Sequence, residues 1–144
     1  MISISSEPID VCKILVDTMD SSAGGIALFV GSVRDHNKDE VVSEIYYEAY
    51  KEMAEENLAQ IENGARKTWS IKKFLAAHRI GNLKVGDVSV AVAVSAEHRK
   101  DAFEACKYAI DEIKIRLPIW KKEVSESGAY WAEGISLQKS DSAW

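Results

Sequence analysis

The sequence has few cysteines and no long hydrophobic segment. Cys12 and Cys106 are its two cysteines, and they form no Cys-x-x-Cys pair, which argues against a redox motif or a disulfide framework. We expect both to be small, buried hydrophobic residues. No apolar run approaches the roughly 18 residues of a membrane span, and the N-terminus lacks the basic and apolar regions of a secretory signal. The expected location is therefore the cytoplasm, with no membrane partner.

Basic charge is scarce for a nucleic-acid-binding protein. The chain has 18 lysine and arginine residues against 23 acidic residues, a net charge of −5, so we expect no nucleic-acid partner. Its histidines, His36, His78 and His98, have no metal-ligand spacing with cysteine or carboxylate residues, and the chain has no Walker loop or Gly-x-Gly-x-x-Gly motif. We expect no metal. A local basic site on this acidic chain would favour a small anionic ligand.

The length and the hydrophobic pattern predict the fold class. A chain of 144 residues, 47% of them hydrophobic, suits a single domain over residues 1–144. The periodicity predicts strands at 2–5, 25–33, 42–49, 71–80 and 88–94, a hairpin at 119–124 and 129–133, and helices at 6–19, 52–69 and 99–117. This mixed order favours the α+β class. The segment 25–33 is apolar on both faces, so we expect a central strand. Residues 134–144 show little periodicity and are interpreted as a C-terminal tail.

One lysine in the predicted helix 99–117 is not placed like a surface residue. At about 100° per residue, Phe103, Ile110 and Leu117 fall within roughly 40° of one another and form the predicted apolar stripe. Lys114 falls on the edge of that stripe. Its stem either covers core surface while the amine reaches water, or the amine is kept for chemistry. Desolvation or neighbouring cations would lower its pKa and make it a nucleophile or proton carrier.

Other cations stand where predicted strands end. His98 and Arg99 follow the strand 88–94 and open a helix, where unpaired backbone N–H groups and the helix dipole hold anions. The alternative is an ordinary solvated junction. Arg34 follows the strand 25–33, at a position where an exposed loop stands on a rigid scaffold. The alternative there is a solvated loop arginine.

Lys121 and Glu123 alternate along the predicted strand 119–124 and therefore share one face. The pair is either a surface ion pair of little energetic worth or, beside Lys114, a device that orients a charge or moves a proton.

Four segments of the chain carry a recognisable pattern: FVGSVRDHN at 29–37, HRIGNLKVGD at 78–87, SAEHRKDAFEA at 95–105 and DEIKIRLPIWKKE at 111–123. Together they resemble the MoaE family, the large catalytic subunits of molybdopterin synthase. They occur in the family's order and spacing, and the resemblance extends from about residue 24 to residue 133. It implies a fold of the α/β-hammerhead type, with a mixed, mostly antiparallel sheet and helices packed on it.

The resemblance also implies an activity and partners. Family members form a homodimer, and each protomer binds a small ubiquitin-like (MoaD-like) subunit, which gives a heterotetramer. That subunit ends in Gly-Gly and carries sulfur as a C-terminal thiocarboxylate. The enzyme is a sulfurtransferase of molybdenum cofactor biosynthesis: it moves two sulfurs onto cyclic pyranopterin monophosphate and forms the dithiolene of molybdopterin. Because the partner brings the sulfur, neither cysteine of this chain is needed, and no cofactor is implied.

The site residues follow from the resemblance position by position. Lys114 and Lys121 match the family's catalytic lysines. Ser32 stands where family members can carry a lysine, so a contact there would come from the backbone. The positions that match substrate-binding residues are Ser32, Val33, Arg34, His98, Arg99, Lys114, Lys121, Lys122 and Glu123.

The length of the helix 99–117 separates these residues into two groups. A helix of that length spans roughly 25–30 Å, so one small substrate cannot contact both of its ends. We therefore expect His98 and Arg99 of one chain to face Lys114 and Lys121 of a second copy.

Two competing hypotheses for the function are a non-catalytic module that binds an anionic ligand or a ubiquitin-like tail, and an unrelated enzyme acting on a small phosphorylated substrate.

Overall fold

The computed structural model describes residues 1–38, 40–125 and 128–131, so the predicted tail 134–144 lies outside the described residues. Its helices are α1 Val11–Thr18, α2 Lys51–Thr68 and α3 Arg99–Arg116. Its strands are β1 Ile2–Ser5, β2 Gly25–Ser32, β3 His36–Asn37, β4 Glu40–Ala49, β5 Ile71–Arg79, β6 Gly81–Lys84, β7 Val88–Ala96, β8 Ile119–Ser125 and β9 Gly128–Trp131. Within these ranges no helix is long and apolar enough to cross a membrane.

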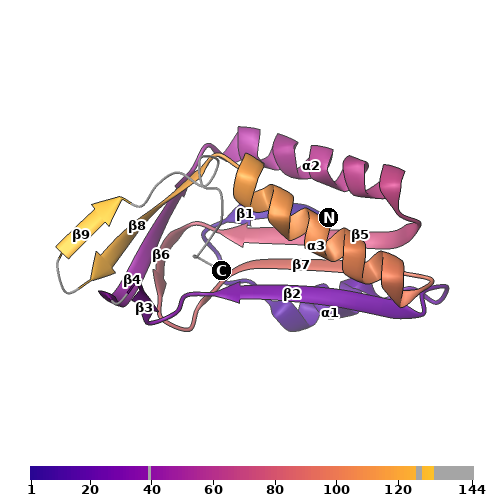
Figure 1. Cartoon of the computed structure of the whole chain (residues 1–144), viewed down its shortest axis with the longest axis horizontal. Helices are drawn as coiled ribbons and strands as arrows, with labels where there is room; N and C mark the ends of the chain where they lie inside the picture. Colours follow the sequence, from indigo (N-terminus) through magenta and orange to yellow (C-terminus); the bar gives the residue numbers. More distant parts are fainter. Residues whose placement is uncertain (39, 126–127, 132–144) are drawn as a thin grey trace.

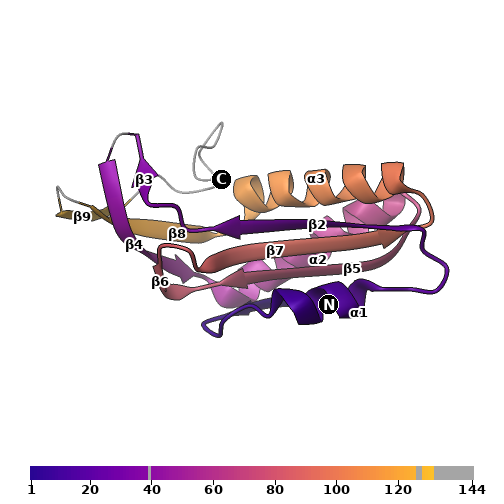
Figure 2. The same cartoon turned by 90° about the horizontal axis from the view of Figure 1, so that it is seen from below.

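The strands form two sheets (Figure 1). One has the order β1-β5-β7-β2, in which β1 and β5 are parallel and the other pairs antiparallel. The second, of order β3-β4-β8-β9 with β6 also paired to β4, lies at one end of the first. Helices α2 and α3 cover one face of the first sheet, and α1 packs on the opposite face (Figure 2). The α+β class and the mixed, mostly antiparallel sheet are thus confirmed.

Strand β7 is the centre of the core, because eight of its nine residues are buried. It has β5 on one side and β2 on the other. Covering both of its faces removes a continuous run of valine and alanine side chains from water, which contributes about 25 cal/mol for each Å² of apolar surface. The buried cluster also includes Val42, Ile45 and Tyr47 of β4, so the two sheets share one hydrophobic core.

The prediction that the strand 25–33 is central was wrong, because β2 is an edge strand of its sheet. Its apolar residues do not all lie under a helix. Ala27 is buried on the face that α3 covers, whereas Leu28 and Val30 point to the other side and are 37% and 39% exposed. Apolar residues on both faces of this segment therefore did not show whether it is a central or an edge strand.

The predicted apolar stripe of α3 was wrong at Phe103, which is 65% exposed, while Ile110 and Leu117 are buried. The buried face of the helix consists mostly of small residues, Ala102, Ala105, Cys106 and Ala109, with Ile110 and Ile113 beside them. Alanines let α3 lie close to β2 and β7, so the large side chain of Phe103 is left at the margin. Lys114 occupies the same margin of the helix and is half-buried.

The two cysteines are both free, but they differ in burial. Cys106 is buried as expected, and burial raises the pKa of its thiol to about 11. Cys12 is exposed, so the expectation that it is buried was wrong. Helix α1 packs instead through its buried Thr18, whose hydroxyl donates to the Ile14 carbonyl oxygen at 2.6 Å.

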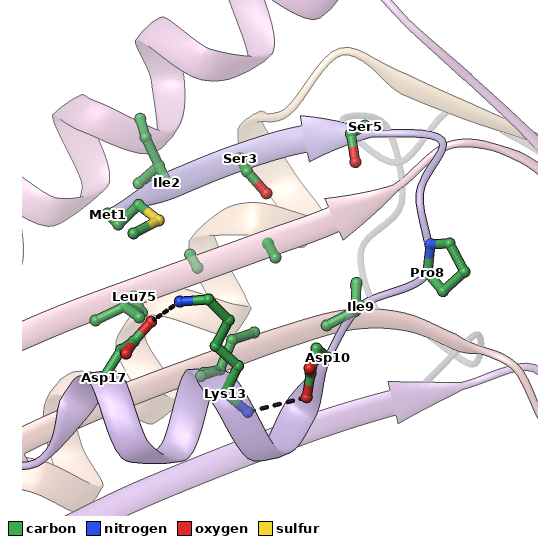
Figure 3. A pocket seen from close by; sticks show the side chains of 13 residues that line it. Met1, Ile2, Ser3, Ser5, Pro8, Ile9, Asp10, Lys13, Asp17 and Leu75 are labelled. Atoms are coloured by element: carbon green, nitrogen blue, oxygen red, sulfur yellow. Dashed lines mark hydrogen bonds and ion pairs between the residues drawn. The ribbon is translucent and has the colours of Figure 1, made fainter.

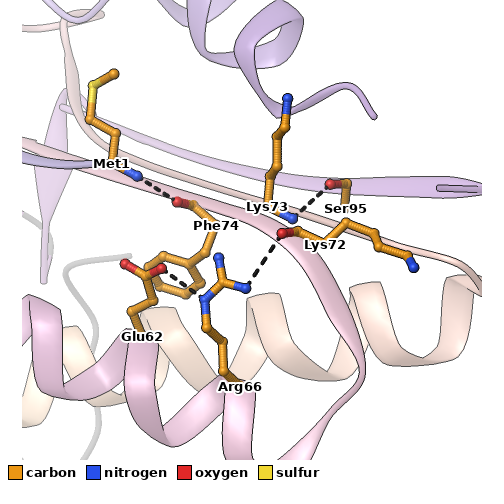
Figure 4. Close-up of polar contacts among 7 residues, drawn as sticks. All are labelled: Met1, Glu62, Arg66, Lys72, Lys73, Phe74 and Ser95. Carbon is orange, nitrogen blue, oxygen red and sulfur yellow. Dashed lines mark hydrogen bonds and ion pairs between the residues drawn. The ribbon is translucent and has the colours of Figure 1, made fainter. Parts of the chain in front are cut away.

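Polar contacts fix the neighbours of β5 in register (Figure 4). The Met1 ammonium group donates to the Phe74 carbonyl oxygen at 2.8 Å. The pairing of β5 with β7 shifts between Ile71 and Lys73, and there the Lys73 N–H donates to the Ser95 hydroxyl at 3.1 Å. The buried hydroxyl thus replaces the ladder partner that the irregularity removes.

A buried histidine in β5 makes stability depend on pH. His78 is 2% exposed, its ring packs edge-on against Tyr47 at 5.2 Å between centroids, and burial lowers its pKa from 6.5 to about 4. Between these two values the unfolded chain binds a proton that the folded chain does not, so the free energy of unfolding falls as the pH drops through this window.

We expect His78→Gln to abolish that part of the pH dependence, which amounts to about 2–3 kcal/mol between pH 7 and pH 4.5. Urea unfolding of both proteins at several pH values measures it. His98→Gln, at an exposed histidine, is the control and should keep the wild-type slope. Parallel curves for wild type and His78→Gln would contradict the assignment.

Candidate functional site

A narrow pocket lies where the end of β2 meets the second sheet. Five of the predicted site residues line it: Ser32, Val33 and Arg34 from the first matched segment, and Lys121 and Glu123 from the last. The structure thus brings together residues almost ninety positions apart in the chain. The remaining lining residues are His36, Asn37, Val42, Ile45 and Tyr47.

Backbone bonds anchor the chain on both sides of Arg34. The carbonyl oxygen of Val33, a residue only 3% exposed, accepts from the N–H of Gly86 at 2.8 Å. Gly86 adopts φ of +93°, a left-handed conformation that glycine tolerates best. On the other side, the Asp35 carbonyl oxygen accepts from the Val42 N–H at 2.8 Å. The exposed Arg34 side chain is therefore presented by a short segment held at both ends.

Lys121 and Glu123 form a buried ion pair on the inner face of β8. Their side chains are 4% and 2% exposed, and the lysine Nζ lies 3.6 Å from the glutamate Oε2. In the β4–β8 register they stand opposite Tyr47 and Ile45. The prediction that both side chains share a face is confirmed, and the alternative of a surface ion pair was wrong. Removing two charges from water is costly, and close pairing with further hydrogen bonds offsets that cost.

Two further residues, Asn37 and Tyr47, lie close to the Glu123 carboxylate. The Asn37 Nδ2 donates to both carboxylate oxygens, at 3.1 and 2.9 Å. Burial raises the pKa of Tyr47 to about 12, the negative charge of Glu123 adds to the effect, and a hydrogen bond with Ser89 opposes it. The phenol therefore keeps its proton at neutral pH.

Sequence reasoning did not single out Asn37 or Tyr47. Asn37 does lie within the matched segment 29–37, but neither the residue type nor the resemblance assigned it a function. Tyr47 lies on a predicted strand, but its position opposite Lys121 depends on the register of β4 with β8. That pairing joins segments some 70 residues apart, and no local pattern fixes it.

The other lysines of the last matched segments lie at the same end of the molecule. Lys114 is in the last turn of α3, and only Leu117 and Pro118 separate this helix from β8. Lys122 pairs with Tyr46 in the β4–β8 register and so points to the opposite face of β8 from Lys121. Lys114 and Lys122 do not line the narrow pocket.

His98 and Arg99 lie at the opposite end of α3. His98 is the N-cap residue, with its side chain exposed and its Nε2 3.8 Å from a Glu97 carboxylate oxygen. Gly24 packs tightly against this junction: its N–H donates to the Ala96 and Glu97 carbonyl oxygens, and a Cβ on it would collide with the latter. The 18 residues of α3 span about 27 Å. One chain therefore does not bring His98 and Arg99 to Lys121.

A second pocket lies between α1 and the strands β1 and β5 (Figure 3). Its charged side chains include Lys13 and Asp17, which form an ion pair at 2.7 Å. None of the predicted site residues lines it. Within the described ranges, no group of three or more histidine, cysteine, aspartate or glutamate side chains is placed to hold a metal ion.

The fold and the pocket define an α+β protein with a buried lysine–glutamate pair beside an exposed arginine. A family model described as MoaE protein matches residues 4–116. The chain is 48% identical to the molybdopterin synthase catalytic subunit of Pyrococcus abyssi over 114 aligned residues. The alignment covers 79% of this chain and 77% of that protein. The chain belongs to the MoaE family, as the resemblance of its segments predicted.

Solved structures agree with this assignment. Molybdopterin synthase from Staphylococcus aureus superposes with a TM-score of 0.86 at 41% identity, over 90% of this chain and 95% of that one. A complex of subunits 1 and 2 of the molybdopterin-converting factor from Helicobacter pylori gives a TM-score of 0.76, over 92% and 90% of the two chains. At 20% identity, this second structure shares the fold alone.

The burial of the ion pair predicts its energetic weight. Glu123→Ala removes the carboxylate that compensates a buried ammonium group, and we expect it to lower the free energy of unfolding by about 3–5 kcal/mol. Asp17→Ala breaks the shorter but exposed Lys13–Asp17 pair and should lower the free energy of unfolding much less, because solvent screens the two charges.

Urea unfolding of both variants at pH 7 measures the difference. Equal losses in the two variants would show that the Lys121–Glu123 pair is energetically a surface pair.

Proposed function

We propose that this chain is the catalytic subunit of a molybdopterin synthase. It is a sulfurtransferase that moves sulfur from the thiocarboxylated C-terminus of a small ubiquitin-like subunit onto cyclic pyranopterin monophosphate. The product is the dithiolene of molybdopterin, in molybdenum cofactor biosynthesis. The observation that carries the proposal is the pocket in which Arg34 and the buried Lys121 come together, in a chain closely similar to named molybdopterin synthase catalytic subunits.

In this proposal Arg34 and the backbone of Ser32 and Val33 receive the substrate. The substrate carries a cyclic phosphate, and a guanidinium group binds such an anion with charge-assisted hydrogen bonds. The exposed Arg34 side chain stands on a segment anchored at both ends, so binding the substrate does not require this backbone to be ordered first. The Glu123 carboxylate lies 3.6 Å from the Lys121 Nζ and pairs with it.

The lysines supply the proton transfers. Attack of the thiocarboxylate sulfur on a carbon of the pterin side chain forms a C–S bond and displaces an oxygen, and water then cleaves the acyl–sulfur bond to release the small subunit as a carboxylate. Both steps require protons to be moved. Lys114, half-buried at the margin of α3, transfers a proton or captures an intermediate covalently. Lys121 stabilises charge or transfers a proton within the pocket. Lys122 lies on the outer face of β8, so its contribution is to the surface that receives the partner's tail.

A second copy of the chain completes the site. His98 and Arg99 stand at the helix end remote from Lys121, so in this proposal they come from the other protomer of a homodimer and hold the substrate's anionic group. Each protomer also binds one small subunit, which gives a heterotetramer. The Helicobacter pylori structure of the same fold is itself a complex of two subunits, which supports a two-subunit enzyme here.

The proposed location is the cytoplasm. Both cysteines are free, and Cys12 is exposed. An exposed thiol of this kind is stable in a reducing compartment and suits a cytoplasmic protein.

Reconstitution tests the activity. We expect the purified chain, mixed with thiocarboxylated small subunit and cyclic pyranopterin monophosphate, to form molybdopterin. The control is the same small subunit with an ordinary C-terminal carboxylate, which should give no product. Binding of both ligands without product would favour the non-catalytic binding module instead.

Two variants separate chemistry from binding. We expect Lys114→Ala to bind both ligands and to lose at least about 100-fold in kcat, as for the removal of a general acid–base group. Arg34→Ala should chiefly raise KM, because a phosphate contact present in both ground and transition state contributes uniform binding. Steady-state kinetics of the two variants measure this. Near-normal turnover by Lys114→Ala would remove it from the mechanism, and an unchanged KM would remove Arg34 from phosphate binding.

A further inference from the structure

Asn37 connects the segment that carries Arg34 to the buried ion pair. It lies in the two-residue strand β3, three positions after Arg34. Its Nδ2 reaches across 86 positions of the chain and donates to both oxygens of Glu123, at 3.1 and 2.9 Å. The same carboxylate lies 3.6 Å from the Lys121 Nζ. One amide thus touches the group that pairs with the proposed catalytic lysine.

The orientation of this amide follows from its partner. An ionised carboxylate only accepts hydrogen bonds, so the NH₂ group of Asn37 must face Glu123. This leaves the Asn37 Oδ1 buried, and among the described residues it has no hydrogen-bond partner. A buried carbonyl in that state costs about 1–3 kcal/mol. A polar residue that carries such a cost is better explained by a role in the site than by a gain in stability.

Among the contacts described for the Glu123 carboxylate, those with Asn37 are the shortest. Tyr47 lies close enough for its pKa to respond to the glutamate charge, but its hydrogen bond is with Ser89. Lys121 faces the carboxylate from the same strand at ion-pair distance, which is too long for a hydrogen bond. The other charged or titratable side chains of the pocket are Arg34 and His36. His36 Nδ1 is paired with Asp35 at 2.8 Å.

We propose that Asn37 is a positioning residue of the sulfur-transfer site: by holding both Glu123 oxygens it fixes the ammonium group of Lys121 and ties it to the segment that presents Arg34. The inference rests on the proposed function for its catalytic consequence. Asn37 does not touch the reacting atoms. It acts through Glu123, so its loss should affect the chemical step rather than the binding of either ligand.

Kinetics of Asn37→Ala test this role. We expect kcat to fall about 10–100-fold, the usual effect of removing a residue that orients a reacting group. KM for the pterin and the affinity for the small subunit should stay within about twofold of wild type. Asn82→Ala is the matched control, since Asn82 is an exposed asparagine of β6 outside the pocket, and it should leave all three quantities unchanged.

Exchanging the amide and the carboxylate between positions 37 and 123 tests whether the contact itself restores activity. Asn37→Asp places a second carboxylate against Glu123 and should be at least as impaired as Asn37→Ala. Adding Glu123→Gln restores one amide and one carboxylate in reversed positions, and we expect it to recover at least about tenfold in kcat over Asn37→Asp alone. If the double variant does not fold, Asn37→Ser decides, because it keeps one donor and should fall between wild type and Asn37→Ala.

A readout independent of turnover separates this inference from the proposed function. Lys121 is labelled with a small amine-acylating reagent and followed by peptide mass spectrometry. In Asn37→Ala the rate of labelling at Lys121 should rise several-fold, and in Asn82→Ala it should not change. If the wild-type chain makes no molybdopterin while this change is seen, the proposed function fails and the positioning role stands.

Any one of three results from Asn37→Ala, or a fourth from the swap variant, would overturn the positioning role. The three are wild-type kcat in Asn37→Ala, a loss of activity that appears wholly in KM, and unchanged labelling of Lys121. A folded swap variant no more active than Asn37→Asp alone would do the same.

Discussion

The stiffness of one helix limits what a single chain can do. The 18 residues of α3 hold its ends about 27 Å apart, and β2 runs beside it with Gly25 near Arg99 and Ser32 at the pocket. Because a helix packed on a sheet cannot bend to bring its ends together, the basic residues fall into two groups. A small phosphorylated substrate bridges them only if a second chain contributes one group. The homodimer is thus a geometric requirement of the proposed site.

At the pocket end, the proposed chemistry centres on a buried ion pair. Lys121 and Glu123 are both almost fully enclosed, so their charges are not screened by water and act strongly on what binds beside them. Such a pair persists only when further hydrogen bonds satisfy it, and Asn37 supplies two of these. Strands β3, β4 and β8 are therefore all needed for one lysine to be held in place. The four-stranded sheet and its helices act as the scaffold for this corner.

Local sequence patterns predicted most of the fold, whereas the burial of the site residues depends on how distant strands pair. Helices α2 and α3 and most of the strands lay close to their predicted positions, since hydrophobic periodicity is a local property. The short strands β3 and β6 were not predicted, and α1 begins at Val11 rather than at residue 6. The errors at β2 and Phe103 arose from tertiary packing: the strand lies at a sheet edge, and alanines set the buried face of α3. That Lys121 and Glu123 are buried depends on the pairing of β8 with β4, which no short-range pattern encodes.

Subunit complementation tests the two-chain site most directly. Lys114→Ala and Arg99→Ala chains are assayed separately at one pterin concentration below KM, then mixed in equal amounts and allowed to exchange subunits. In a mixed dimer one site carries both defects and the other carries none. Random exchange makes half of the dimers mixed, so we expect these dimers to supply about a quarter of wild-type activity. A mixture no more active than the sum of the separate variants would show that each site belongs to one chain, and would contradict the account.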